Sequence, residues 1–551
     1  MMVRTGDPLR WAALLRIKRL LHRSMMCAWD WCSPLPSLEI VRCQITASDV
    51  VSLIDMPNIE QDTIVAVATP VGRGGIGVVR VSGPRAREVV TPLLRLRHEL
   101  AAGRARFAEI LDVSGATPHV SESSPFDKLR AGDGAPTAVE GTAVLDEAVV
   151  TYFAAPNSYT GEDVVEIAAH GAPVLLEYLV RACCAGGARL AEPGEFTQRA
   201  FLAGRIDLTQ AEAVDDLIGS STLEQARVAA RQLGGALARQ VSAPKELLVG
   251  LIAAMEAGID FAEDDIDILP AQEIAGKILE VRGPLAELER SFAYGRVVRE
   301  GFTLAIVGRP NVGKSSLFNR LVERERAIVT ATPGTTRDTV AERVSMAGIP
   351  VELIDTAGLR EATDEAERMG IARSREAMAE AGVVLLVIDA LVGIGEEERE
   401  VLEGMGGRGA ILVWNKWDLV AGEGEMGHVE IAAAAETQIS KSRCGAPEFV
   451  AVRTSALMGE GIEEVRAAIV EAVVGGGVRE GGMLTNLRQH GAVVEAVRGL
   501  DAGMDAVRAG IPHEMVLLDL YGALRGLDAL TGATTNEDVL RLIFSRFCIG
   551  K

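Results

Sequence analysis

Residues 308–315 read Gly308, Arg309, Pro310, Asn311, Val312, Gly313, Lys314, Ser315. They directly follow the apolar run 302–307, and the helix-forming residues 316–322 come next. This is the Walker A spacing, in which a buried strand leads into a glycine-rich loop whose backbone N–H groups surround a phosphate. Lys314 would reach the β/γ oxygens, and the Ser315 hydroxyl would bind Mg²⁺. The stretch therefore predicts a nucleoside triphosphate site.

A second motif predicts which base is bound. An NKxD box follows the apolar strand 410–414 and consists of Asn415, Lys416, Trp417 and Asp418. The Asp418 carboxylate can accept hydrogen bonds from N1–H and the exocyclic amine of guanine, whereas adenine has no such donor pair on that edge. The stem of Lys416 can cover the ring. The strand 449–452 precedes a short loop of the kind that helps to hold guanine, namely Ser455, Ala456 and Leu457.

A third box lies between these two, at the end of the apolar strand 351–354. It consists of Asp355, Thr356, Ala357 and Gly358. A carboxylate at this place can hold Mg²⁺ through water, and a glycine amide can meet the γ-phosphate. Strands, loops and helices alternate throughout residues 301–478, which predicts a doubly wound parallel sheet with its ligands at the carboxyl ends of the strands.

Leu359 stands where many small GTPases have a glutamine that orients the attacking water. A leucine cannot do this, so hydrolysis must use another water-positioning group and another positive charge near the β/γ bridge. The segment 330–338 is rich in oxygen donors, and Thr336 is placed to complete the Mg²⁺ shell. Glu367 lies in an acidic stretch farther on, for which a solvated helix start is the ordinary explanation.

Three further segments read PNSYTGED at 156–163, EPGEFTQRAFL at 192–202 and FCIGK at 547–551. Together with the nucleotide boxes, they resemble the bacterial MnmE (TrmE) family of tRNA-modification GTPases, over most of residues 56–551. The nucleotide boxes alone fit many GTPases. The three segments narrow the choice to this family.

The resemblance implies that K⁺ takes the electrostatic role of an arginine finger when two G domains meet across the nucleotide. The implied ligands of this ion are the side chains of Asn311 and Thr335 and the backbone carbonyls of Thr330 and Thr332. Glu367 matches a glutamate that orients the attacking water through a bridging water, and Arg360 lies in the same switch segment. The predicted GTP contacts also include Ser316, Ala331, Pro333 and Gly334.

Residues 63–82 have the pattern of strand, glycine-rich bend and strand, which by itself fits an ordinary hairpin. The resemblance implies that residues 56–206 form an α+β folate-binding domain that dimerises. Its implied folate contacts are Arg80, Glu166, Arg205 and Lys551, with Arg205 where some relatives have lysine. A carboxylate can accept from the N–H donors of a pterin, and cations can pair with carboxylate or carbonyl groups of the ligand.

Residues 207–300 and 479–551 place apolar residues at helical spacing, as in Leu247, Leu248, Leu251, Ile252 and Met255. We predict one discontinuous helical domain, into which a Ras-like G domain, residues 301–478, is inserted. The acidic run 263–267 fits a solvated loop better than a metal site. Nucleotide-driven movement of the G domain could then act on the helices that carry the C-terminal tail.

The chain has 551 residues, of which 48% are apolar and 24% charged, and a formal net charge of −21. This length suggests three or four domains. The acidic balance argues against a broadly basic nucleic-acid groove, so tRNA contacts would be local or shared with a partner. Apart from the N-terminus, no run approaches the roughly 18 apolar residues of a membrane span. Seven cysteines without paired spacing, including Cys183 and Cys184, indicate a reducing cytoplasm.

Two segments differ from the rest of the chain. Residues 1–55 are rich in arginine, cysteine and tryptophan, which fits a transit peptide or, better, a misassigned start, because the family resemblance begins at Met56. Residues 114–142 are rich in Ser, Gly, Ala and Pro and fit a surface insertion. We expect both to be disordered. An ordered insertion would shade the folate entrance.

Cys548 is a candidate nucleophile or acid/base toward a tRNA uridine, and the ordinary alternative is a small buried thiol. The resemblance implies a K⁺-stimulated, homodimeric GTPase that adds a carboxymethylaminomethyl or aminomethyl group at C5 of the wobble uridine. A 5,10-methylene or 5-formyl tetrahydrofolate would be the one-carbon donor. FAD would belong to an MnmG-like partner in a heterotetramer, since this chain has no dinucleotide fingerprint. Two rival interpretations stay open: a ribosome-assembly GTPase without base chemistry, and a scaffold whose folate site is vestigial.

Overall fold

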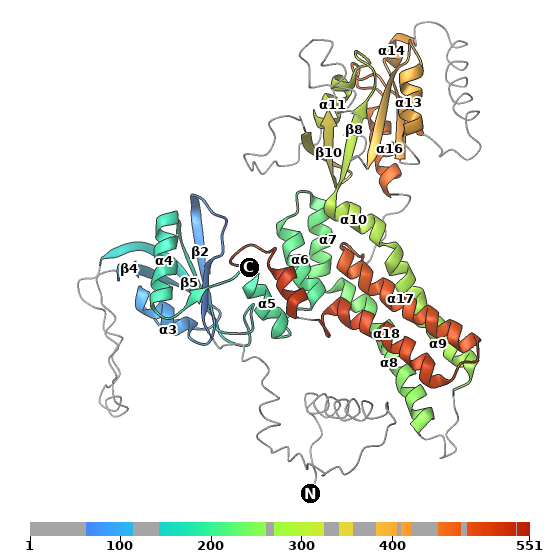
Figure 1. Cartoon of the computed structure of the whole chain (residues 1–551). Helices are drawn as coiled ribbons and strands as arrows, with labels where there is room; N and C mark the ends of the chain where they lie inside the picture. Colours follow the sequence, from blue (N-terminus) through green and yellow to red (C-terminus); the bar gives the residue numbers. More distant parts are fainter. Residues whose placement is uncertain are drawn as a thin grey trace, which may run out of the picture. The chain divides into compact units, whose positions relative to one another are not determined.

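The computed structural model describes residues 62–113, 143–260, 269–323, 341–355, 382–404, 409–420, 450–474, 482–535 and 537–551. The predicted N-terminal extension 1–55, the insertion 114–142 and the acidic run 263–267 lie outside these residues. The described residues belong to the compact unit 62–551 (Figure 1). They contain two β-sheets and a set of long helices.

The N-terminal part is a seven-stranded sheet with the order β3-β4-β5-β6-β2-β1-β7. Its strands are β1 (Ile64–Val67), β2 (Gly74–Ser82), β3 (Leu94–Leu96), β4 (Arg104–Leu111), β5 (Val144–Phe153), β6 (Val164–Gly171) and β7 (Arg189–Leu190). All neighbours are antiparallel except the parallel pair β1 and β7. The predicted strand, bend and strand of residues 63–82 are β1 and β2.

One face of this sheet packs on α3 (Ala86–Val90), the 3₁₀ turn η1 (Thr91–Leu93) and α4 (Pro173–Ala185), and their apolar residues share one core. Val79 and Val81 of β2 belong to that core. Because neighbouring residues of a strand point to opposite faces, Arg80 projects from the other face. There it is the register partner of Glu166 on β6.

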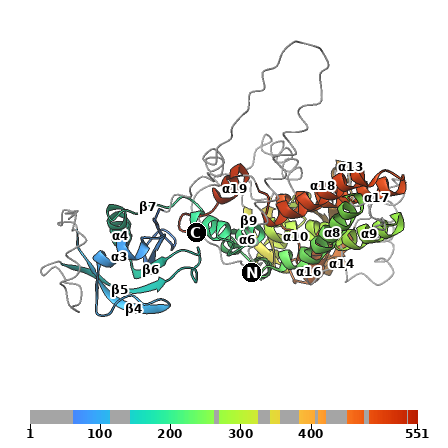
Figure 2. The same cartoon turned by 90° about the horizontal axis from the view of Figure 1, so that it is seen from below.

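The helical part draws on two separate stretches of the chain. Its first helices are α5 (Glu195–Leu202), α6 (Leu208–Ile218), α7 (Leu223–Leu233), α8 (Ala236–Asp260), α9 (Ala271–Arg290) and α10 (Phe292–Glu300). The later ones are α17 (Leu487–Arg508), α18 (His513–Thr531) and α19 (Glu537–Phe544). Figures 1 and 2 show α17 and α18 alongside α8 and α9, and these four helices share one apolar core.

Local sequence explains where two of these helices begin. Asp207 accepts from the backbone N–H of Gln210, whose side chain accepts in return from the backbone N–H of Asp207. Thr222 and Gln225 form the same capping box at the start of α7. Such boxes satisfy N–H groups that have no partner within the helix. They therefore fix the first turns of α6 and α7.

The third part is a six-stranded sheet with the order β13-β12-β11-β8-β10-β9. Its strands are β8 (Phe302–Val307), β9 (Ala341–Met346), β10 (Ile349–Asp355), β11 (Val383–Asp389), β12 (Gly409–Asn415) and β13 (Val450–Arg453). The strands from β13 to β10 are parallel, as predicted. The edge strand β9 runs antiparallel to β10, which the sequence analysis did not anticipate.

Both faces of this sheet are covered. Along β8, Leu304 and Ile306 enter a core shared with α11 (Lys314–Glu323) and α16 (Ile462–Val474). Ala305 and Val307 enter a second core, on the side of α13 (Glu396–Gly404). Two buried faces explain why β8, β11 and β12 are nearly continuous apolar runs. The fold class predicted from the sequence, mixed α/β and α with a doubly wound sheet, is confirmed.

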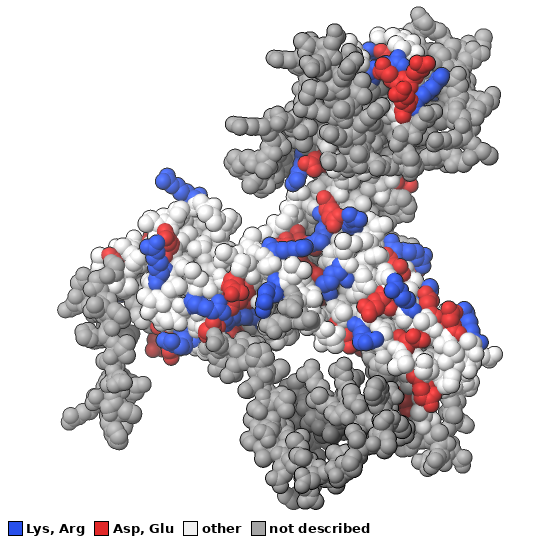
Figure 3. Space-filling model, viewed as in Figure 1, with Lys and Arg blue, Asp and Glu red and all other residues white. Residues whose placement is uncertain are grey.

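On the face drawn in Figure 3, basic and acidic side chains of the described residues are interspersed, and neither sign forms a broad field. Among the described helices, none has the length and apolar character that a membrane crossing requires.

Candidate functional site

The predicted phosphate loop lies between β8 and α11, as the Walker A motif requires. Gly308 has a φ of +145°, and a Cβ atom there would collide with the carbonyl oxygen of Val387. Gly313 has a φ of +100°, and a Cβ there would collide with the side-chain amide of Asn415. Both glycines are thus needed for backbone conformation and for close approach. The loop closes tightly against β11 and β12.

Lys314 lies across this loop. Its Nζ donates to the carbonyl oxygens of Gly308 at 2.7 Å and Arg309 at 2.8 Å. Lys314 is also the first residue of α11, and the dipole at the start of a helix favours an anion. Ser315, the predicted Mg²⁺ ligand, lies exposed in the same turn. The arrangement suits a polyphosphate.

A buried carboxylate, which the sequence analysis missed, fixes the start of the loop. Glu398 on α13 is 2% exposed and forms an ion pair with the guanidinium of Arg309. The same carboxylate accepts from the backbone N–H of Gly395 at 2.8 Å. No motif identifies Glu398, because its partner lies far away in the sequence.

Asn415 joins the two ends of the predicted nucleotide site. Its Nδ2 donates to the carbonyl oxygen of Val312 at 2.8 Å, and its Oδ1 accepts from the backbone N–H of Ala456 at 2.9 Å. The side chain is buried, so these bonds lie away from water. Asn415 therefore acts as a brace between the phosphate loop and the predicted guanine loop.

Other side chains complete the guanine end. Lys416 has a φ of +63°, and its Nζ forms an ion pair with Asp389 at 2.7 Å, at the end of β11. Arg320 of α11 donates to the carbonyl oxygens of Ala456 and Leu457. Asp418 is half-buried in the first turn of α14 (Trp417–Val420). The structure thus brings the Walker A, NKxD and guanine-loop residues together, and adds Asp389.

Some predicted site residues lie outside the described part of the chain. These are Thr330, Ala331, Thr332, Pro333, Gly334, Thr335, Thr336, Thr356, Ala357, Gly358, Arg360 and Glu367. Asp355 is described as the last residue of β10. Of the predicted K⁺ ligands, Asn311 is described, and it is one of the few non-glycine residues with a positive φ, +66°.

The predicted folate residues Arg80 and Glu166 form a close pair. The Nε and Nη2 atoms of Arg80 both lie 2.8 Å from Oε1 of Glu166. The Arg80 guanidinium also lies over the rings of Tyr159 and Phe196, at 6.0 and 5.7 Å from their centroids. These two aromatic residues belong to the segments 156–163 and 192–202. Both segments therefore help to build the surroundings of Arg80.

Arg199 joins these two segments. It is 6% exposed and forms ion pairs with Asp62 at 2.6 Å, Glu195 at 2.9 Å and Glu162 at 3.1 Å. Burial alone would lower the pKa of Arg199, but these carboxylates raise it above its usual value. The network orients α5 and the loop 158–163, so several residues that carried the family resemblance have a structural role.

The C-terminal tail reaches the same place. Ile549 forms a β-bridge with Pro193, and the carbonyl oxygen of Gly550 accepts from Nη1 of Arg80 at 3.2 Å. Cys548 is a free, exposed thiol, which excludes the alternative of a buried one. Lys551 is half-buried beside it. The structure thus brings Arg80, Glu166, Cys548 and Lys551 together.

Arg205 lies on a neighbouring loop. It is exposed, and its Cγ would lie 3.6 Å from a Cβ atom at Gly161. The segment 156–163 is therefore its neighbour in the structure.

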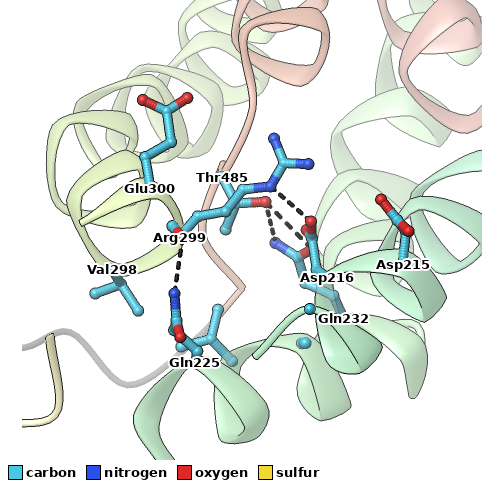
Figure 4. A pocket seen from close by; sticks show the side chains of 11 residues that line it. Asp215, Asp216, Gln225, Gln232, Val298, Arg299, Glu300 and Thr485 are labelled. Carbon is cyan, nitrogen blue, oxygen red and sulfur yellow. Dashed lines mark hydrogen bonds and ion pairs between the residues drawn. The ribbon is translucent and has the colours of Figure 1, made fainter. Parts of the chain in front are cut away.

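The helical part contains a cavity of about 280 Å³ (Figure 4). It lies among α6, α7 and α10, where Nε of Arg299 donates to Asp216 at 2.6 Å and Gln225 donates to the Arg299 carbonyl at 2.8 Å. Burial raises the pKa of Asp216 to about 6, although Arg299 opposes the shift. None of the predicted site residues lines this cavity.

Comparison with known proteins gives a consistent result. Residues 208–548 match the family model described as MnmE helical domain, and residues 63–205 match the one described as GTP-binding protein TrmE N-terminus. The tRNA modification GTPase MnmE of Koribacter versatilis is 54% identical over 495 residues, covering 89% of this chain and 99% of that protein. The protein of that name from Acetivibrio thermocellus is 38% identical over 494 residues, covering 89% of this chain and 100% of that protein.

Among solved structures, the match to Era of Aquifex aeolicus bound to GDP.AlF4− covers 36% of this chain and 66% of the Era chain. The identity is 26% and the TM-score 0.25.

Proposed function

We propose, from the premise that this chain belongs to the MnmE family of tRNA modification GTPases, that its GTP hydrolysis drives a folate-dependent modification of tRNA in the cytoplasm. The reaction adds a carboxymethylaminomethyl or aminomethyl group at C5 of the wobble uridine. One observation carries this proposal beyond GTP hydrolysis. The C-terminal tail that carries the exposed thiol of Cys548 reaches the Arg80–Glu166 pair, because the Gly550 carbonyl accepts from Arg80.

The chemistry of the Arg80–Glu166 pair supports a pterin ligand. Glu166 retains an exposed fraction of 30%, and its carboxylate can accept from ring and amino N–H donors. Arg80 can pair with a carbonyl or carboxylate of the same ligand. Arg205 and Lys551 would supply further positive charge. A reduced folate, in the 5,10-methylene or 5-formyl form, would bring the one-carbon unit when bound there.

The nucleotide end supports GTP turnover assisted by cations. Ser315 and Thr336 would hold Mg²⁺, and Asn311, Thr330, Thr332 and Thr335 would hold K⁺. Leu359 removes the usual water-orienting glutamine, so we assign that role to Glu367, with Arg360 nearby. K⁺ would stabilise charge on the phosphates once two G domains of a homodimer meet.

The organisation of the molecule is part of the same proposal. Residues 56–206 would form the folate-binding domain, 207–300 and 479–551 the helical domain, and 301–478 the inserted G domain. The shared core of α8, α9, α17 and α18 supports this division. An MnmG-like partner would carry FAD and complete a heterotetramer.

Binding of 5-formyl-tetrahydrofolate to the full chain tests the folate assignment. We expect saturable binding that Arg80→Ala and Glu166→Ala each weaken by about tenfold or more, because each removes a charge-assisted contact. Arg181→Ala and Glu177→Ala are matched controls, since this exposed pair lies on α4. They should change affinity less than about twofold. Absence of saturable binding would favour either a ribosome-assembly GTPase or a scaffold with a vestigial folate site over tRNA modification.

A further inference from the structure

The segment around Cys548 is fixed on both sides. Before it, Phe547 is 6% exposed, and its ring lies 5.4 Å from that of Phe544 in a small core with Leu208. After it, Gly550 is buried. Between these anchors, Cys548 and Ile549 are exposed. The chain therefore presents a thiol on a short bridge between two buried points.

The second anchor depends on glycine. Gly550 has a φ of +97°, and a Cβ atom there would collide with the backbone carbonyl of Val67. Any L side chain would be strained in this conformation and would also need space that β1 occupies. The Ile549–Pro193 bridge and a bond of 3.5 Å from the N–H of Gly194 to the Cys548 carbonyl extend the same contact.

Arg80 holds this anchor from the side. Its Nη1 donates to the Gly550 carbonyl, while its other N–H groups face Glu166. The side chain is 17% exposed and lies over the rings of Tyr159 and Phe196. A guanidinium directs several donors in fixed directions, so one ion pair and one backbone bond can share it. Its place is thus defined independently of the tail.

We propose that Arg80 is a positioning residue for the tail, and that its bond to the Gly550 carbonyl holds Cys548 at the Arg80–Glu166 site. This inference rests on the proposed role of Cys548 in uridine modification. Fixing a reacting group within a bound geometry lowers the entropic part of a barrier. The tail contact would then raise the rate of modification without touching GTP hydrolysis.

Gly550→Ala tests the close contact of the tail with β1 without altering Arg80. We expect amide hydrogen exchange in the tail peptide to become about fivefold faster or more, and the kcat of tRNA modification to fall by at least about tenfold. GTP turnover should stay unchanged. Gly510→Ala is the matched control, because Gly510 also has a positive φ, +68°, but open space around it. It should leave tail exchange and modification as in the wild type.

Arg80→Lys tests the bond between Arg80 and the Gly550 carbonyl, since lysine keeps the positive charge and loses the several fixed donors of the guanidinium. Tail exchange should rise here too. The proposal is wrong if both variants keep wild-type tail exchange, or if a loosened tail leaves the modification rate intact. Failure of the wild-type chain to modify tRNA would instead contradict the proposed function. The hydrogen-exchange data would still show whether Arg80 holds the tail.

Discussion

Asn415 shows how one side chain can organise a site from a distance. The NKxD motif predicted Asn415 as a GTP-binding residue, and the structure adds bonds to Val312 and Ala456, which belong to two other motifs. Each of these bonds lies in a buried setting, where an unpaired polar group is costly. Motif spacing identified Asn415 and Lys314. It could not identify Asp389 or Glu398, because a paired carboxylate leaves no pattern in the sequence around it.

Glu398→Gln tests the support of the phosphate loop. The change keeps an oxygen acceptor and removes the charge that faces Arg309, whose carbonyl in turn binds Lys314. A lost bond to a charged group costs about 1.5–3 kcal/mol, so we expect GDP affinity, measured with a fluorescent analogue, to fall about tenfold. Glu397→Gln is the matched control, since Glu397 is 76% exposed and lies 3.7 Å from Arg309. Equal affinities of the two variants would contradict the role of Glu398.

At the scale of elements, α6, α7 and α10 meet around a polar cavity whose residues the sequence could not bring together. Helical spacing predicted apolar faces, and α8 follows that pattern with Leu248, Leu251 and Met255 buried. Polar residues such as Asp216 and Gln225 carry no such signal, because their partners are a side chain and a carbonyl of another helix. Periodicity therefore predicts the core, while buried polar contacts depend on tertiary packing.

Because Asp216 ionises, the stability of the folded chain depends on pH. Its pKa in the folded chain is about 6, mainly because of burial, against an ordinary value of 3.8. The folded state thus binds the proton more tightly than the unfolded state, so this group lowers stability as pH rises from about 4 to 6. The cost above that range is at most about 3 kcal/mol.

Asp216→Asn should therefore improve stability relative to the wild type more at pH 8 than at pH 4.5. Urea denaturation at the two pH values measures this difference. Asp505→Asn is a suitable control, because Asp505 is 78% exposed and should give the same small effect at both. A pH-independent effect of Asp216→Asn would show that the carboxyl does not titrate with a raised pKa.

At the scale of the whole molecule, the two predicted centres belong to separate sheets, and the helical core is built from two stretches far apart in the sequence. Each nucleotide motif lies within a few consecutive residues, so motif spacing predicted the GTP site, whereas the folate contacts were implied by family resemblance and stay a prediction. The tail contact was implied by family resemblance alone. A five-residue terminus has no periodicity. It contacts Val67, Arg80 and Pro193, and no rule of sequence spacing connects these residues to it.

The proposed K⁺ mechanism belongs to this scale, because it requires two copies of the chain. GTP turnover should be about a hundredfold faster in KCl than in NaCl at equal ionic strength, as expected for loss of a preorganised charge. Glu367→Ala should lower the KCl rate about a hundredfold. Glu365→Ala serves as the neighbouring acidic control. Equal rates in both salts would remove the K⁺ assignment, and full activity of Glu367→Ala would remove that of Glu367.

The core of α8, α9, α17 and α18 joins two stretches of the chain that are translated at different times. Leu248 and Ile278 leave the ribosome long before their packing partners Val493 and Leu520 are translated. The described residues of the intervening sheet form two cores with helices of the same part, so this part can fold during this interval, since domains generally fold as units while the nascent chain grows. The parts of α8 and α9 that pack on α17 and α18 must meanwhile remain uncovered. Translation pauses before residue 484 would thus leave the nascent chain most dependent on chaperones.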